Sequence, residues 1–158
     1  MGAHLGETVA AGDVERLFRE ESPRLWRSLV AYSRDPELAS DAVSEAFTLA
    51  LESPVDILSA RGWVWRVAFR LATKELKRRP RSAGREVDQI SWPEPAVELL
   101  STLSGLTPRQ RAAVVLFYYA DQPVEAIARI LDSTSAAVRV HLMRGRRRLR
   151  EILEQDDE

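Results

Sequence analysis

The chain has 158 residues, 45% hydrophobic and 30% charged, which suits a globular protein of one domain or two small ones. It contains no cysteine, which excludes disulfides and thiolate metal sites and is compatible with a reducing cytoplasm. No apolar run approaches the roughly 20 residues of a membrane helix, and the N-terminus does not resemble a signal peptide. We therefore expect a cytoplasmic protein that makes no membrane contact.

The net charge of -1 conceals a strong segregation of charge along the chain. Residues 1–60 contain eleven acidic and five basic residues. Residues 61–85 contain nine basic residues and one acidic residue, and residues 139–150 contain six basic residues and no acidic one. Two basic blocks far apart in the sequence predict two separate contacts with a polyanion.

The first two helical patterns follow one another closely. Apolar residues recur at helical spacing from Asp13 to Val30, and Pro23 is expected to kink this helix or split it in two. Asp35 and Pro36 mark a turn and a restart. In the next helix the residues expected on the core face are Ala39, Ala42, Val43, Ala46, Phe47 and Ala50. The opposite face carries Asp41, Glu45, Thr48 and Glu52.

A third helix is predicted over residues 61–79, which read RGWVWRVAFRLATKELKRR. A loop should precede it, because Pro54 disfavours continuation of the helix before it. At about 100° per residue, one narrow face of this helix carries the following side chains. They are Trp63, Arg66, Arg70, Thr73, Lys74 and Lys77. Trp63 could either face DNA or belong to the core, and Trp65 is expected in the core.

Residues 80–95 contain three prolines and a glycine among polar residues, without a helical stripe. This composition predicts an interdomain linker. Trp92 lies within it and could either make a docking contact or pack back on the nearer domain.

The C-terminal part carries three helix starts in succession. Thr107 to Gln110 form a Thr-x-x-Gln capping box with Pro108 at the first helical position. Pro123 marks a second start, and Thr134 is a good N-cap for a third. The third helix is expected to bury Val138, Leu142, Gly145, Leu149 and Ile152 and to expose its arginines. This pattern predicts a helix-turn-helix whose second helix enters a DNA major groove, the alternative being a helical hairpin with solvated arginines.

These residues resemble region 4 of sigma-70-family sigma factors, specifically the extracytoplasmic-function (ECF) group. Residues 106–111 (LTPRQR) resemble the family's LPPRQR opening, residues 125–131 (EAIARIL) its EEIAEIL helix, and residues 138–150 its VKSRLHRARRRLR helix. Asp132 replaces the usual turn glycine, which its tolerance of left-handed geometry permits. Pro123 replaces the usual capping serine, so Gln122 or Asp121 is expected to cap instead.

The N-terminal part resembles region 2 of the same family. Residues 41–47 (DAVSEAF) resemble its DLVQExF element, and residues 63–68 (WVWRVA) resemble its WLFRIA element. Arg70 stands where asparagine is usual and Lys74 where aspartate is usual, and both changes add positive charge. The resemblance implies an all-α fold of two small helical domains, residues 13–79 and 96–153, joined by a flexible linker at residues 80–95.

The resemblance also implies the function and the surfaces that carry it. It implies a sigma factor that binds the β′ clamp and β flap of RNA polymerase core, opens the −10 element of a promoter and reads the −35 element. The expected polymerase contacts are Asp41, Ser44 and Glu45. The expected −10 contacts are Arg61, Trp63, Arg66, Arg70, Lys74, Lys77 and Arg78, beside a base pocket formed by residues 55–60. The expected −35 contacts are Thr134, Ser135, Ala136, Arg139, Val140, Met143, Arg144, Arg146 and Arg147. An anti-sigma factor is a further expected partner.

The sequence contains no recognisable catalytic or metal-binding motif. The two histidines, His4 and His141, lie far apart, and His141 is expected on the outer face of the basic helix. There is no metal-ligand cluster, phosphate loop or nucleophile-base pair, so we expect no catalytic residue, metal, cofactor or small-molecule substrate. Two alternatives to a sigma factor are a helix-turn-helix regulator that does not bind polymerase core and a module that kept the sigma fold without promoter use. Only the sigma factor explains both basic blocks and the acidic helix face.

Overall fold

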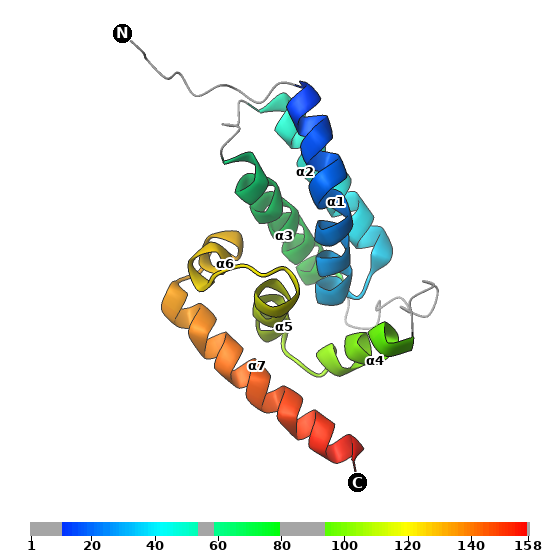
Figure 1. Cartoon of the computed structure of the whole chain (residues 1–158), viewed down its shortest axis with the longest axis vertical. Helices are drawn as coiled ribbons and strands as arrows, with labels where there is room; N and C mark the ends of the chain where they lie inside the picture. The colour runs from blue at the N-terminus through cyan, green and yellow to red at the C-terminus, as the bar shows by residue number, and fades with distance from the viewer. Residues whose placement is uncertain (1–10, 54–58, 80–93, 158) are drawn as a thin grey trace.

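A computed structural model describes residues 11–53, 59–79 and 94–157, with the side chains of residues 94–97 excepted. Within these ranges the chain forms helices and short turns and no strand, which confirms the all-α prediction (Figure 1). Residues 80–93, including Trp92, and residues 55–58 of the expected base pocket lie outside the described residues.

Helix α1 (Ala11–Ser33) runs through Pro23 without a break, so the possible split into two helices does not occur. A proline inside a helix removes one hydrogen bond and crowds the preceding turn, at a cost of about 3 kcal/mol. Leu25 and Leu29 lie beyond it with no exposed surface. Burying a leucine side chain contributes about 1.5–3 kcal/mol, so packing on the core offsets the proline.

Helix α2 (Pro36–Glu52) starts where the sequence predicts. The Asp35 carboxylate accepts hydrogen bonds from the backbone N–H groups of Glu37 and Leu38, each at 3.1 Å. Asp35 is itself buried and forms an ion pair with Arg79, which ties the end of α3 to the start of α2. All six residues expected on the core face of α2 are buried.

Helix α3 (Ala60–Arg78) completes an N-terminal bundle of three helices. Its Trp65 and Phe69 rings stack at a centroid distance of 6.3 Å, and Phe69 stacks on Tyr32 of α1 at 5.5 Å. The Trp65 indole N–H donates to buried Glu21 at 3.0 Å, so the ring is buried with its polar atom satisfied. Trp65 therefore belongs to the core, as expected.

The C-terminal part contains α4 (Glu94–Leu103), α5 (Pro108–Val114), the π-helix η3 (Val115–Tyr119), α6 (Val124–Ile130) and α7 (Ser135–Asp156). Helix α4 begins at Glu94, so the last two residues of the expected linker are helical. The capping box is present as predicted, because the Thr107 hydroxyl accepts from the Gln110 N–H and the Gln110 side chain accepts from the Thr107 N–H.

The turn between α6 and α7 also forms as predicted. Asp132 has a φ of 54°, in the left-handed region, and the Thr134 hydroxyl accepts from the N–H of Ala137 at 3.1 Å. The expected cap of α6 is wrong, however. Pro123 is the N-cap residue and no side chain caps this helix, because Gln122 bonds to the Ala120 carbonyl and Asp121 pairs with Arg24.

The two groups of helices pack against each other. Helix α6 lies on α3, and α5 with η3 lies on α1, while α7 runs along the outside (Figure 1). The buried apolar residues of both groups form one continuous core cluster, from Val14 to Leu142. Below we call helices α1–α3 the N-terminal half and helices α4–α7 the C-terminal half.

Candidate nucleic-acid interface

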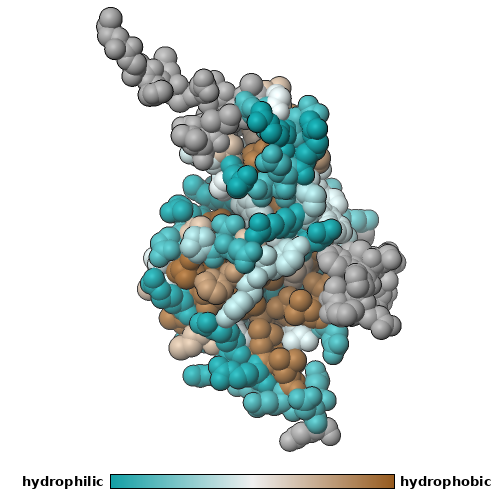
Figure 2. Space-filling view, in the orientation of Figure 1, coloured by the Kyte–Doolittle hydropathy of each residue, from teal (hydrophilic) through white to brown (hydrophobic). Residues whose placement is uncertain are grey.

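Helix α7 presents a basic surface to solvent. It buries Val138, Leu142 and Gly145 against the rest of the C-terminal half. Its six arginines are all exposed: Arg139, Arg144, Arg146, Arg147, Arg148 and Arg150. A row of hydrophilic side chains follows this helix in the space-filling view (Figure 2).

Some of these arginines are engaged within the chain. Arg139 lies 3.7 Å from Glu125, Arg146 donates to the Tyr118 hydroxyl at 3.1 Å, and Arg148 lies 3.3 Å from Glu151. The remaining three have no hydrogen-bond or ion-pair partner among the described residues. These are Arg144, Arg147 and Arg150. Exposed pairs of this kind are weak, so all six arginines remain available to a polyanion.

The first turns of α7 offer a surface suited to base edges. Ala136, Val140 and Met143 follow helical spacing and are all exposed, Val140 by 38% and Met143 by 49%. Ser135 is half-buried, and the hydroxyl of Thr134 is already engaged as the cap. The structure thus brings the expected −35 residues together along one helix.

His141 lies elsewhere than expected. It is half-buried on the side of α7 that faces α5, not on the outer face, and it lines a cavity together with Arg109 and Arg144. Burial lowers the pKa of His141, and the positive charges of Arg109 and Arg144 lower it further. At neutral pH a histidine with a lowered pKa is uncharged, so it adds no charge to the basic surface.

Helix α3 carries the second basic surface. Arg66, Arg70, Lys74, Lys77 and Arg78 are exposed along it. The other two expected −10 residues, Arg61 and Trp63, are less accessible to a DNA partner. Arg61 is paired with Glu21 at 2.7 Å and Glu20 at 3.6 Å, and Trp63 is half-buried.

Trp63 faces the C-terminal half. It lines a cavity of about 540 Å³ between α3 and α6, whose walls also include Arg66 of α3 and Ala126 and Arg129 of α6. The ring packs on the edge of the core, which supports the core interpretation in part, and a contact with DNA stays a prediction. It is neither fully buried nor fully exposed.

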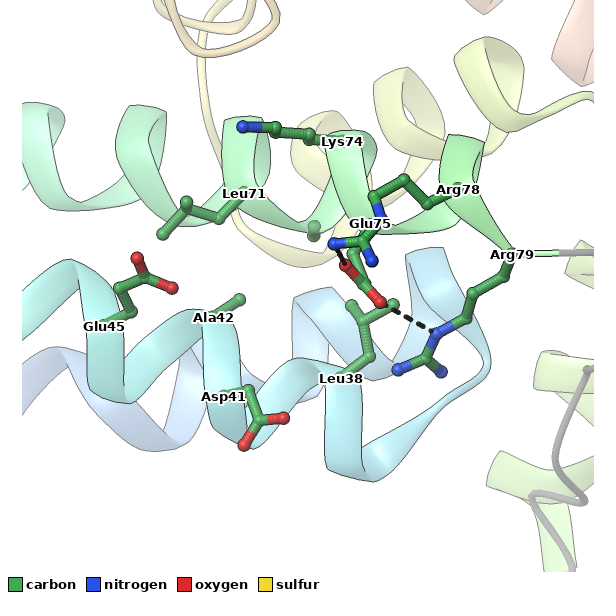
Figure 3. A pocket seen from close by; sticks show the side chains of 10 residues that line it. Leu38, Asp41, Ala42, Glu45, Leu71, Lys74, Glu75, Arg78 and Arg79 are labelled. Carbon is green, nitrogen blue, oxygen red and sulfur yellow. Dashed lines mark hydrogen bonds and ion pairs between the residues drawn. The ribbon is translucent and has the colours of Figure 1, made fainter.

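The expected polymerase contacts project from α2. Asp41, Ser44 and Glu45 are all exposed, and neither carboxylate has a partner among the described residues. Asp41 and Glu45 border a groove of about 330 Å³ between α2 and α3, opposite Lys74 (Figure 3). Arg78 and Arg79, which line the same groove, are paired with Glu75. The α2 wall of the groove is therefore acidic, whereas the α3 wall combines Lys74 with the paired charges of Glu75, Arg78 and Arg79.

Two arginines that join the halves were not assigned a role from the sequence. Arg111 ends the LTPRQR motif, but its partner is the backbone of Tyr32, 79 residues earlier. Arg24 contacts Ala120, which is 96 residues later. No local pattern indicates such partners, because both acceptors are backbone carbonyls.

Within the described ranges, no three histidine, aspartate or glutamate side chains are grouped to hold a metal ion. None of the helices described is sufficiently long and apolar to span a membrane.

The sequence was compared with protein families and with proteins of known function. Residues 96–149 match the family model for sigma-70, region 4. The chain is also similar to the ECF RNA polymerase sigma factor SigE of Mycolicibacterium smegmatis, with 26% identity over 165 aligned positions. That match covers 94% of this chain, but the chain spans only 64% of the relative's length.

Two solved structures share the fold. The structure of CnrH in complex with the cytosolic domain of CnrY has a TM-score of 0.71 at 21% identity and covers 90% of this chain and 88% of that one. The sigma factor RpoE of Bartonella quintana, in complex with the anti-sigma factor NepR, has a TM-score of 0.72 at 17% identity and covers 91% and 98%. These comparisons confirm the resemblance seen in the sequence: residues 96–149 match sigma-70, region 4, and nearly the whole chain is similar to an ECF sigma factor.

Proposed function

We propose that this chain is an ECF-type sigma factor that directs RNA polymerase core to specific promoters and initiates transcription. The observation that carries the proposal is the arginine-covered helix α7, exposed behind a capped turn within a sigma-70 region 4. A recognition helix of this kind binds the major groove, and its arginines bind phosphates. The second basic surface on α3 supports a second contact with DNA.

We assign the contacts with polymerase and promoter separately to the two groups of helices. In this proposal residues 13–79 bind the polymerase clamp and the −10 element, and residues 96–153 read the −35 element and meet the β flap. The described part of the chain suits this division, since α2 offers the free carboxylates and α3 and α7 offer the two basic surfaces. The protein would work in the cytoplasm with polymerase and promoter DNA, and no reaction is assigned to it alone.

An anti-sigma factor is a further proposed partner. It is supported by the similarity to RpoE of B. quintana, which was solved with the anti-sigma factor NepR bound.

Run-off transcription tests the main proposal. Core polymerase with this chain should produce transcripts from a subset of promoters in fragmented genomic DNA, while core alone should produce none of them. The alternative, a helix-turn-helix regulator that does not bind core, predicts no transcript and no co-purification with core, although DNA binding would remain. It is less favoured because the match to SigE covers both halves of the chain.

A further inference from the structure

The cavity that His141 lines has a volume of about 620 Å³ and is bounded by helices α1, α3, α5 and α7. Tyr32 of α1 and Lys77 of α3 contribute to it from the N-terminal half. Arg109 of α5 and Arg144 of α7 contribute from the C-terminal half. Small-molecule sites in proteins are concave and measure about 300–1,000 Å³, so this cavity is large enough for one.

The cavity carries an excess of positive charge. Lys77, Arg109 and Arg144 line it from three different helices, and Asp132 is the one carboxylate among its described lining residues. None of the three cations has a hydrogen-bond or ion-pair partner in the described part of the chain. The charge acts on His141, whose pKa is lowered by burial and further by Arg109 and Arg144. An anion would offset this repulsion, and the oxygens of a phosphate can bind several cations at once.

The remaining walls offer hydroxyl groups and an apolar surface. The hydroxyls of Tyr32 and Thr73 share a hydrogen bond of 2.9 Å, in which either can be the donor. Whichever hydroxyl accepts this bond keeps its own proton, which it can donate to a ligand. Leu76, Pro108 and Leu131 supply apolar parts of the wall. The cavity therefore suits a molecule that combines a phosphate with an apolar or planar part.

A DNA backbone is the other source of phosphates for these cations, because Lys77 and Arg144 are also among the expected promoter contacts. Of the groups that line the cavity, however, Thr73 and His141 are half-buried and Tyr32 is buried. A small molecule can enter the cavity and reach such groups. The phosphates of a duplex belong to a wide, stiff helix, which meets exposed side chains instead. The half-buried groups therefore favour a small ligand over a duplex.

We propose that this cavity binds a small phosphorylated molecule of nucleotide size. Its phosphates lie between Lys77, Arg109 and Arg144, and its apolar part lies on Leu76 and Leu131. Because Lys77 belongs to one half of the chain and the two arginines belong to the other, both halves hold the ligand. This site goes beyond the function proposed above and does not depend on it.

The site is tested by nuclear magnetic resonance of the His141 imidazole, with adenosine diphosphate (ADP) as the probe. The chain has two histidines, so His4→Gln leaves the imidazole signal of His141 alone. Bound ADP should raise the pKa of His141, because a phosphate stabilises the charged imidazole beside Arg109 and Arg144. The pH titrations with and without ADP share one ionic strength, so that salt screens the arginines equally. An unchanged pKa at saturating ADP would overturn the site. The other charged or titratable groups that line the cavity are Tyr32, Lys77 and Asp132.

Variants without one charge show whether the named side chains hold the probe. Lys77→Met and, separately, Arg144→Met should weaken ADP binding about ten-fold, since each removes a hydrogen bond to a charged group. Lys74→Met and Arg147→Met are the matched controls, because each removes an exposed cation three positions away on the same helix, outside this cavity. Circular dichroism should show native helix content for all four variants, whose substituted side chains are exposed. Equal weakening by a control and its partner variant would mean that ADP binds the basic surfaces generally, and the site would be lost.

Three further probes separate the possible occupants. Adenosine lacks the phosphates and should leave the pKa of His141 unchanged. Inorganic phosphate lacks the apolar part and should bind about ten-fold more weakly than ADP, and equal affinity would remove the apolar contact from the proposal. A short DNA duplex that raises the pKa of His141 as far as ADP does would assign the cavity to DNA phosphates and overturn the small ligand. Run-off transcription is independent of these measurements, so failure of the sigma-factor function would leave the site standing, and the reverse also holds.

Discussion

At the scale of single residues, the arginines of α7 should divide into those that select a sequence and those that only add affinity. Arg139 lies near the start of the helix and Arg147 lies two turns further on, and both are exposed. Arg139→Ala should change which −35 sequences are preferred, by about 1–3 kcal/mol if its base contact is bidentate. Arg147→Ala should weaken binding to all sequences alike and reduce the salt dependence. Titrations of a −35 sequence panel at several salt concentrations would show this, and a uniform loss in both variants would contradict it.

The carboxylates of α2 provide a second prediction at this scale. Asp41→Lys combined with Glu45→Lys should weaken the binding of polymerase core, because their free charges face solvent and suit a basic partner. Folding should be nearly unaffected, since exposed substitutions change stability by about 0.5 kcal/mol or less. Glu15→Lys with Glu98→Lys makes the same change in charge at two exposed positions on other helices and serves as the control. Equal core affinity for both double variants in a titration would remove the assignment.

At the scale of elements, the packing of α7 on α5 depends on a glycine. A Cβ built at Gly145 would lie 2.9 Å from the Val114 side chain, whereas one at Gly62 of α3 would meet nothing within 4 Å. Alanine is favoured over glycine in helices by up to about 1 kcal/mol. Gly62→Ala should therefore raise the free energy of unfolding, while overpacking of about 1–3 kcal/mol should make Gly145→Ala neutral or destabilising. Urea denaturation measures both, and equal stabilisation would show that α7 does not pack closely on α5.

Helix α3 should act on DNA that is already separating. Arg70 and Lys74 lie one turn apart on its exposed face, a spacing that suits a phosphate backbone. Arg70→Ala with Lys74→Ala should impair transcription from duplex promoters and recover in part on templates mismatched across −10. Equal impairment on both templates would indicate simple docking. No impairment on either would remove this helix from the DNA.

At the scale of the whole molecule, the shared core predicts cooperative unfolding. All four tryptophans lie at or before position 92, so their fluorescence follows mainly the N-terminal half, while far-ultraviolet circular dichroism follows every helix. Because one core cluster joins the halves, both signals should change at the same temperature in the unaltered chain. The Arg24→Met and Arg111→Met double variant lacks both arginine bonds between the halves, so its fluorescence and circular dichroism transitions should occur at different temperatures. Separate transitions in the unaltered chain would show instead two domains that unfold independently.

Much of this protein was determined by the sequence itself, because helix starts and core faces depend on residues a few positions apart. Thr107 and Thr134 cap their helices as predicted, and Asp35 caps the helix whose restart was predicted there, since each side chain reaches an N–H only two or three residues ahead. The core face of α2 followed from helical spacing in the same way. The exposure of the α7 arginines could also be predicted, because the apolar residues of this helix fall on one face and residues 139–150 include no acidic residue.

Only the tertiary structure decided how the halves meet. Trp63 and Trp65 are two residues apart on one helix, yet Trp65 lies in the core and Trp63 lines the cavity beside α6, because a different neighbour covers each face. The same holds for His141, which the packing of α5 places in a half-buried position beside Arg109. The bonds of Arg24 and Arg111 join residues 96 and 79 positions apart to backbone carbonyls. Every residue carries such a carbonyl, so the sequence holds no pattern for this pairing, and only the fold leaves these two acceptors free and within reach.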